Sequence, residues 1–292
     1  MKRILVTGAT GYIGQYLIDE LLRSGHTVIA TSAHPEKAVR TAWYTRVRYI
    51  PFDLSVYEPA LNYYRFFEEP DGMIHLAWEG LPNYKDAFHI QENYPRHAAF
   101  LENLLRNGMR DLTVTGTCLE YGMQEGALRE DLPARPATPY ATAKDMLRRR
   151  IQELQADRPF VFRWVRLFYM YGSGQASKSL FSQLNQALAE GASVFNMSGG
   201  EQVRDYLPVD KVAKYLARIA LQAKITGIIN CCSGHPVTVR DLVEDYLRRS
   251  HQIITLNLGY YPYPDYEPMK FWGDNKKLLS ITDSIVDDSM LN

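Results

Sequence analysis

Short apolar runs alternate with longer amphipathic stretches through most of the chain. The runs are rich in aliphatic residues and end at glycine, proline or polar residues, as expected of buried strands. In the stretches, apolar residues recur with the period of a helix. Strands that alternate with helices in this way are typical of an α/β fold with a parallel, doubly wound sheet. The predicted strands span residues 1–6, 27–31, 48–51, 72–77, 112–115, 160–167 and 227–232, and the predicted helices span residues 12–24, 90–107, 140–154, 180–190, 209–223 and 236–251.

A glycine-rich turn joins the first predicted strand to the first predicted helix, with Gly8, Gly11 and Gly14 in a G-x-x-G-x-x-G spacing. Glycine lacks a Cβ, so backbone amides in such a turn can come close to a pyrophosphate. The helix N-terminus that follows presents N–H groups to the anion. Glycines also make ordinary tight turns, so the spacing alone is a weak signal. Its place directly after a strand favours a Rossmann-type dinucleotide-binding unit.

The alternation of strands and helices changes after Arg166. We interpret residues 1–165 as a dinucleotide-binding domain that residues of about 206–234 complete. Residues 166–205 and 235–292 are expected to form a smaller C-terminal substrate-binding domain.

Composition and charge exclude several classes of protein. The chain has 292 residues and a net charge of zero, so no general attraction to nucleic acid or to an anionic membrane is expected. We interpret Arg148–Arg150 as part of a solvated helix face. No apolar run approaches the length of a membrane span. The cysteines, Cys118, Cys231 and Cys232, suit neither a disulfide framework nor a metal site, so a cytoplasmic protein without a metal is expected.

The end of the second predicted strand bears on the choice of cofactor. An acidic residue there would bind the 2′-hydroxyl of NAD and repel the 2′-phosphate of NADP. The residues after Thr31 instead offer Ser32, His34 and Lys37, which could contact a phosphate or form only a polar loop. We therefore predict NADPH, with NADH as the alternative. Asp53, after the third strand, could accept a hydrogen bond from adenine or cap the next helix.

Tyr140 and Lys144 lie four residues apart on a predicted helix, so both side chains share one face. A neighbouring ammonium favours the phenolate and lowers the pKa of a tyrosine. Such a phenol can donate a proton to a carbonyl as hydride arrives, or accept one in reverse. Thr117, at the end of the fifth strand, can hydrogen-bond the same oxygen. Tyr140 could instead only pack at the helix start and Lys144 be a surface charge, but the three residues together favour catalysis.

These motifs resemble those of the extended short-chain dehydrogenase/reductase family, the NAD(P)-dependent nucleotide-sugar epimerases, dehydratases and reductases. The resemblance covers nearly the whole chain. The matching segments are residues 7–14 (T-G-x-x-G-x-x-G), 53–54 (D-L), 75–78 (H-L-A-A, with Trp78 as a departure), 117–122 (S-x-x-V-Y-G), 140–144 (Y-x-x-x-K) and 204–213 (R-D-F-x-x-V-D-D-V-A).

Taken with the patterns above, the resemblance implies roles for individual residues. The catalytic residues are Thr117, Tyr140 and Lys144, and Asn93 helps to hold Lys144 through water. Arg204 grips the substrate diphosphate, although a surface ion pair with Asp205 is the alternative. The expected cofactor contacts are Gly8, Thr10, Gly11, Tyr12, Ile13, Ser32, His34, Lys37, Asp53, Leu54, Leu76, Ala77, Trp78, Asn93, Thr115, Tyr140 and Lys144. The expected substrate contacts are Trp78, Thr117, Tyr169, Lys178, Arg204, Tyr261 and Tyr263, although the tyrosines could only pack under a loop.

Departures from the family narrow the expected chemistry. Cys118 and Leu119 stand where the family's 4,6-dehydratases carry Asp-Glu, and Leu119 stands where the epimerising reductases carry Cys. Tyr169 replaces an Asn that often contacts substrate. The chain looks most like the 4-ketoreductases that act on nucleoside-diphosphate 4-keto-6-deoxyhexoses in deoxysugar and polysaccharide biosynthesis.

Two other functions are alternatives to this 4-ketoreductase. The main alternative is a nucleotide-sugar 4-epimerase with tightly bound NAD, which would use the same residues. A non-catalytic dinucleotide sensor is disfavoured because Tyr140 and Lys144 are both present. The resemblance also implies a homodimer formed by helices 90–107 and 140–154.

Overall fold

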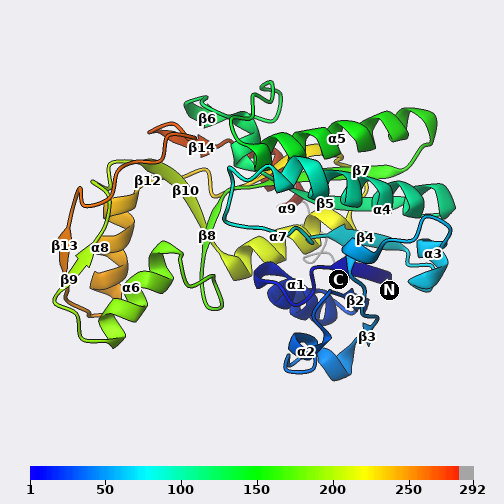
Figure 1. Ribbon diagram of the computed structural model, residues 1–292, viewed down its shortest axis with the longest axis horizontal. Helices are drawn as coiled ribbons and strands as arrows, with labels where there is room; N and C mark the ends of the chain where they lie inside the picture. The colour runs from blue at the N-terminus through cyan, green and yellow to red at the C-terminus, as the bar shows by residue number, and fades with distance from the viewer. Residues whose placement is uncertain (283–292) are drawn as a thin grey trace, which may run out of the picture.

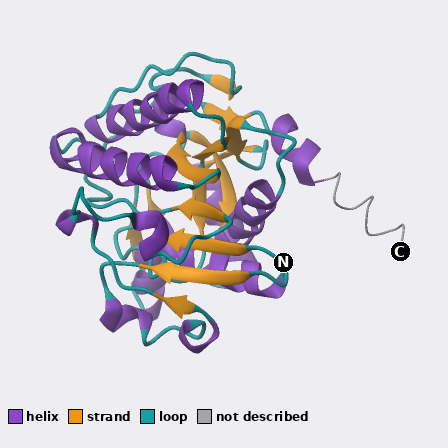
Figure 2. Ribbon diagram, turned by 90° about the vertical axis from the view of Figure 1, so that its right-hand side faces the viewer, coloured by secondary structure: helices purple, strands orange, loops and turns teal. Residues whose placement is uncertain are grey.

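The computed structural model describes residues 1–282, and its centre is a seven-stranded sheet in the order β11-β7-β5-β4-β1-β2-β3. Every neighbouring pair of strands in it is parallel. The strand order reverses at β1, so the sheet is doubly wound and the predicted fold class is confirmed. Figure 2 shows the strands side by side with helices on both faces. The strands are β1 (Arg3–Thr7), β2 (Thr27–Thr31), β3 (Arg48–Tyr49), β4 (Gly72–His75), β5 (Asp111–Thr117), β7 (Val161–Leu167) and β11 (Gly227–Cys231).

Two hydrophobic cores fix the helices to the sheet. In Figure 1, α4 and α5 lie side by side over one face of the sheet, and α1 and α7 lie together over the other. Leu17 and Leu21 of α1 are fully buried in one core, and Phe100 and Leu104 of α4 are buried in the other. Burying one such side chain contributes roughly 1.5–3 kcal/mol. The helices are α1 (Tyr12–Arg23), α3 (Tyr63–Phe66), α4 (Tyr94–Asn107), α5 (Pro139–Asp157), α7 (Val209–Leu221) and α9 (Lys276–Thr282).

A smaller group of elements extends to the left of the main sheet in Figure 1. Its core includes Phe181, Leu184, Phe195 and Val243. β8, β10 and β12 form one sheet, β9 pairs with β13, and β6 pairs with β14. These elements are β6 (Gly126–Leu128), β8 (Tyr169–Tyr171), α6 (Leu180–Ala189), β9 (Val194–Asn196), β10 (Val203–Pro208), β12 (Pro236–Thr238), α8 (Val239–Arg249), β13 (Thr255–Asn257) and β14 (Phe271–Gly273).

Short turns of helix complete the connections between these elements. They are α2 (Pro35–Ala38), η1 (Tyr44–Arg46), η2 (Leu54–Val56), the π-helical turn η3 (His89–Asn93) and η4 (Cys118–Tyr121). All three cysteines are free and buried. Within the described residues, no helix is long and apolar enough to cross a membrane.

Several predicted elements have different bounds in the structure, most clearly the helix predicted at 236–251 and the strand predicted at 72–77. Residues 236–238 do not begin a helix but pair with β10 as β12, and Thr238 then caps α8. The strand predicted at residues 72–77 ends at His75. α9 packs against α7 and β11, so the end of the described chain returns to the main sheet. The division into two domains stays a prediction, and its residues 283–292 lie outside the described part.

Candidate active site

The turn between β1 and α1 leaves room only for glycine at its tight points. Gly8 has φ +66°, and a Cβ there would lie 2.8 Å from the backbone nitrogen of Ala77. A Cβ on Gly14 would lie 2.5 Å from the carbonyl oxygen of Gly8. No side chain caps the N-terminus of α1 at Gly11, so backbone N–H groups there can bind an anion. The turn, which also contains Thr10, Tyr12 and Ile13, therefore fits a dinucleotide pyrophosphate.

Three of the predicted segments meet because β1, β4 and β5 end side by side. Thr7 is in register with His75, and His75 is in register with Val114. Two hydrogen bonds tie the strand ends together. The Thr7 hydroxyl accepts the N–H of Ala77 at 3.3 Å, and the Thr115 hydroxyl donates to the His75 carbonyl at 3.1 Å. The glycine turn, Leu76, Ala77, Trp78 and Thr115 consequently lie at one edge of the sheet.

The loop after β2 contains both signs of charge. Ser32 is buried, and its hydroxyl lies 3.0 Å from that of Tyr49. His34 lies 3.3 Å from the carboxylate of Glu36, and Lys37 is exposed. Glu36 offsets the charge of Lys37 in α2, while Arg40 and Arg46 add positive charge before β3.

Asp53 has the local role that the sequence left open as an alternative. Its carboxylate accepts the N–H of Ser55 at 2.8 Å and caps η2, which begins at Leu54. Contact of Asp53 or Leu54 with adenine stays a prediction.

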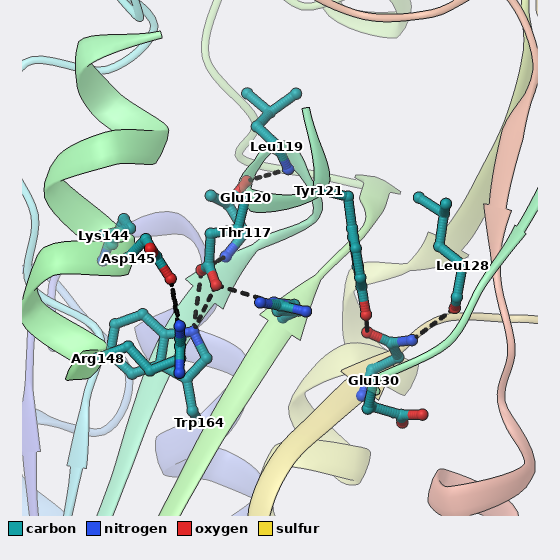
Figure 3. Close-up of polar contacts among 12 residues, drawn as sticks. Thr117, Leu119, Glu120, Tyr121, Leu128, Glu130, Lys144, Asp145, Arg148 and Trp164 are labelled. Carbon is teal, nitrogen blue, oxygen red and sulfur yellow. Dashed lines mark hydrogen bonds and ion pairs between the residues drawn. The ribbon is translucent and has the colours of Figure 1, made fainter. Parts of the chain in front are cut away.

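Thr117 ends β5 and is held by a capping box (Figure 3). Its hydroxyl oxygen accepts the N–H of Leu119 at 3.2 Å, and the Glu120 carboxylate accepts the N–H of Thr117 at 2.9 Å. Glu120 is fully buried and also accepts hydrogen bonds from the indole of Trp164 at 2.9 Å and from Arg166 at 2.8 Å. The buried carboxylate thus fixes the Thr117 backbone, and the hydroxyl proton remains available for another oxygen.

Tyr140 and Lys144 lie in the first turns of α5, and both are buried. Burial raises the pKa of the Tyr140 hydroxyl, and a hydrogen bond with Thr117 opposes that rise. Burial lowers the pKa of Lys144 to about 7. The amine donates to the Thr115 carbonyl at 3.0 Å and lies 3.9 Å from the centre of the Trp78 ring. Loss of water around the phenol thus dominates the pKa of Tyr140, and the lowering by Lys144 stays a prediction.

Asn93 contacts the segment that follows β4. Its amide donates to the Glu79 carbonyl at 2.9 Å and lies 3.3 Å from Nδ1 of His89. The indole N–H of Trp78 donates to the same His89 nitrogen at 3.1 Å. Asn93 therefore holds the residues after β4 in place, and its predicted contact with Lys144 through water stays a prediction.

Arg204 is buried in β10, where only 2% of its surface is exposed. Its guanidinium pairs with Glu267 at 3.0 Å and donates to the carbonyls of Val203 at 2.9 Å and Met269 at 3.0 Å. The alternative of a surface ion pair with Asp205 is wrong. Asp205 is itself buried and binds backbone N–H groups of residues 233, 234 and 273.

Glu267 connects Arg204 to another predicted substrate residue. The Tyr169 hydroxyl donates to the second carboxylate oxygen of Glu267. Tyr169 packs against the apolar cluster that contains Cys118 and Tyr140, so the Arg204 pair and the Thr117 group belong to one region. Burial raises the pKa of the Cys118 thiol, which is therefore neutral. Glu267 lies outside every motif, and no sequence signal singled it out.

The remaining predicted substrate residues are more exposed. Tyr261 makes an edge contact with Tyr260, and the Tyr263 hydroxyl donates to Glu201. Lys178 is exposed in the turn before α6. Their side-chain contacts are thus with the smaller group of elements, and their substrate role stays a prediction.

A neighbouring loop does reach the catalytic helix. The Tyr84 ring lies 5.4 Å from that of Tyr140 and 5.7 Å from that of Tyr266. Lys85 pairs with Asp265 at 2.6 Å. A cavity of about 300 Å³ is lined by Tyr266 and residues 82–86. These contacts join the segment after β4 to the loop that contains Glu267, beside Tyr140.

Comparison with known proteins identifies the family. The model of the NAD-dependent epimerase/dehydratase family matches residues 4–232. The chain belongs to this family. The resemblance that its motifs indicated is thereby confirmed, and the chain is an enzyme of a family that acts on nucleotide sugars with NAD.

Several members of the NAD-dependent epimerase/dehydratase family are similar over most of the chain. The dTDP-6-deoxy-L-talose 4-dehydrogenase (NAD(+)) of Aggregatibacter actinomycetemcomitans is 30% identical over 276 residues, which cover 92% of this chain and 98% of the relative. A UDP-glucose 4-epimerase of Streptococcus mutans serotype c is 25% identical over 236 residues, 73% of this chain and 70% of the relative. The solved structure of MoeE5 in complex with UDP-glucose and NAD has a TM-score of 0.79 and 25% identity, covering 95% of this chain and 91% of that one.

Proposed function

We propose that the protein catalyses NAD(P)H-dependent reduction of the C4 keto group of a nucleoside-diphosphate 4-keto-6-deoxyhexose to a nucleotide-linked 6-deoxyhexose. The observation that carries the proposal is the group formed by Thr117, Tyr140 and Lys144. The two residues directly after Thr117 do not supply a second acid and base. Cys118 and Leu119 are buried in an apolar cluster instead. Such a site suits proton transfer to one carbonyl oxygen, and Cys118 and Leu119 replace the Asp-Glu pair with which the family's 4,6-dehydratases eliminate water.

The relatives support a reaction at C4. The talose relative is named as a 4-dehydrogenase of a dTDP-6-deoxyhexose, and oxidation of that hydroxyl is the reverse of reducing the 4-keto sugar. The epimerase relatives are named for C4 as well. The common element is transfer of hydride at C4, and the departure at Cys118 and Leu119 argues against the dehydratases of the family.

Residues of the chain donate the proton that this reaction needs and stabilise the charge that forms. A bound NAD(P)H would supply hydride for the new C4–H bond. As the C=O π electrons move to oxygen, Tyr140 donates its hydroxyl proton to that oxygen and is left as the phenolate. The Thr117 hydroxyl, which hydrogen-bonds Tyr140 in the structure, can donate its proton to the same oxygen. Charged Lys144 stabilises the phenolate, and Arg204 binds the substrate diphosphate, which a guanidinium can contact bidentately.

Of the two cofactors, we propose NADH, which the sequence left as the alternative to NADPH. Glu36 places a carboxylate beside His34 and Lys37 in the loop after β2, where it would repel a 2′-phosphate. The talose relative is named for NAD(+). Both observations favour NADH, although no acidic residue stands at the end of β2.

The test mixes purified protein with NADH and a panel of nucleotide-linked 4-keto-6-deoxyhexoses. The expected result is one NADH oxidised per sugar consumed, followed by absorbance and by chromatography of the product. The 4-epimerase alternative predicts a different result: a non-keto nucleotide hexose would convert to its C4 epimer with no net loss of NADH. The spectrum of the purified protein adds to this, because a retained dinucleotide favours the epimerase.

A further inference from the structure

Trp78 occupies a position beside the catalytic helix where the family motif H-L-A-A has a small residue. Its ring lies 4.6 Å from that of His97, nearly parallel at 24°. Its indole N–H donates to Nδ1 of His89 at 3.1 Å, and Nε2 of His89 lies 3.1 Å from the carbonyl of Asn83. The indole is therefore held both at its face and at its edge, and its orientation is fixed by the segment after β4.

The amine of Lys144 lies directly over this ring, 3.9 Å from its centre. A tryptophan face attracts a cation more strongly than any other aromatic side chain. Within residues 1–282, no carboxylate lies within ion-pair distance of Lys144. Its one hydrogen-bond partner is the Thr115 carbonyl, and the charge of Glu120 acts only from farther away. The Trp78 face is thus the main polar contact of the ammonium besides one carbonyl.

The histidines around Trp78 add no second positive charge beside its ring. His97 Nδ1 lies 2.7 Å from His75 Nε2, and His75 Nδ1 lies 2.8 Å from the Thr7 hydroxyl. Burial lowers the pKa of His75 to about 3 and that of His97 well below its usual value, and it also lowers the pKa of His89. All three are therefore neutral near pH 7, and the Tyr140 ring meets Trp78 edge-on at 6.0 Å. Of these groups only Lys144, with a pKa of about 7, carries part of a charge at that pH.

We propose that Trp78 is a positioning residue, whose ring holds the Lys144 ammonium against the Thr115 carbonyl and keeps it charged in a site that lacks a carboxylate partner. The inference rests on the role of Lys144 in the proposed function, but its geometry is independent of the substrate. It assigns to Trp78 a contact with the catalytic lysine in addition to the predicted contacts with cofactor and substrate.

The first test measures the fluorescence of Trp78 and needs no substrate. The fluorescence of the full-length protein is titrated from pH 5 to 9.5, and the spectra of Trp78→Phe are subtracted to remove the other three tryptophans. The difference signal is expected to change with a midpoint near pH 7 and to lose this change in Lys144→Met. Trp272→Phe, which alters a tryptophan on β14, should leave the change in place. A flat signal, or a change that persists in Lys144→Met, overturns the proposal.

The second test measures the pH dependence of kcat/KM in wild type, Trp78→Phe and Trp78→Leu. Loss of charge on Lys144 gives the alkaline limb, and removing the ring disfavours the charged form, so the limb should move to lower pH. The expected shift is about 0.5–1.5 pH units for Trp78→Leu and less for Trp78→Phe, whose ring still attracts a cation. A uniform loss of rate with an unmoved limb would mean that Trp78 only packs. If the protein reduces no 4-keto sugar, the proposed function fails while the fluorescence test still decides the role of Trp78.

Discussion

The carboxylate of Glu267 lies 3.0 Å from the guanidinium of Arg204, and both side chains are at least nine-tenths buried. The sequence predicts that Arg204 binds the substrate diphosphate, yet this guanidinium already has an anionic partner. Because two anions at one guanidinium repel each other, a diphosphate that binds Arg204 must displace Glu267 or share the site with it. Glu267 should therefore weaken the binding of nucleoside diphosphates.

Glu267→Gln is expected to tighten the binding of a nucleoside diphosphate by about five- to tenfold, because the competing charge is lost. The same change should lower the stability of the protein, since Arg204 then lacks its buried counter-ion. Calorimetric titration with the nucleoside diphosphate measures the first effect and urea unfolding the second. Asp265→Asn, at an exposed position two residues away, is the matched control and should change neither. Weaker binding by Glu267→Gln would show that Glu267 contacts the substrate instead.

Tyr140→Phe is expected to lower kcat about a hundredfold to ten-thousandfold, because the ring stays but its transferable proton is lost. Cofactor should still bind, since the buried ring keeps its packing against Tyr84. The measurements are kcat with the best 4-keto substrate and the Kd for NADH. Tyr246→Phe removes a hydroxyl on α8 that bonds to Asn185, and it should leave both values unchanged. Turnover of Tyr140→Phe within a few-fold of wild type would exclude Tyr140 as the acid.

Lys144→Met is expected to stabilise the protein at neutral and acidic pH. The pKa of Lys144 is about 7 in the fold against 10.5 normally, so the unfolded chain binds more protons than the folded one between these values. Stability of the wild type therefore rises with pH through this window, and below pH 7 the full cost, a few kcal/mol, is present.

Urea unfolding without added cofactor at pH 6, 8 and 10 tests the sign of this prediction. The excess stability of Lys144→Met over wild type should be largest at pH 6 and nearly gone at pH 10. Lys214→Met, at an exposed position on α7, should show no such trend. An excess that does not depend on pH would contradict the lowered pKa.

Hydrophobic patterns predicted the long elements well because burial against a sheet imposes them. β1, β2, β5 and β7 are nearly fully buried, and each appears close to its predicted bounds. The strands outside the main sheet were not predicted. All of them but β10 have only three residues, which is too few for a periodicity of their own. β12 was taken for the start of a helix for this reason, because its pairing with β10 is a tertiary contact.

The motifs located Thr117, Tyr140 and Lys144, whose spacing depends on local structure. They did not indicate what those residues contact. Glu267 is 63 positions from Arg204 in the sequence, so only the fold brings the pair together. The contact between Trp78 and Lys144 likewise depends on how β4 and α5 sit at one sheet edge, although the departure of Trp78 from the family motif was visible.

The choice between NADH and NADPH depends on the charge of one loop. The sequence favoured NADPH because no acid stands at the end of β2, but the structure places Glu36 at 3.3 Å from His34 in the loop that follows. A carboxylate there repels a 2′-phosphate, and it offsets the attraction of Lys37. We therefore expect kcat/KM to be higher with NADH than with NADPH at matched ionic strength.

Glu36→Gln leaves Lys37 unopposed, so it should raise kcat/KM for NADPH about fivefold and change that for NADH little. The ratio of the two kcat/KM values is the quantity to compare, because it cancels changes in the amount of active protein. Asp19→Asn removes an exposed carboxylate of α1 that pairs with Arg46, and it should leave the ratio unchanged. If wild type clearly prefers NADPH, the phosphate contact belongs to Lys37 or His34 and the sequence-based expectation is correct. If wild type prefers NADH but Glu36→Gln keeps the same ratio, Glu36 does not face the ribose, and the discrimination must come from the buried end of β2 at Ser32.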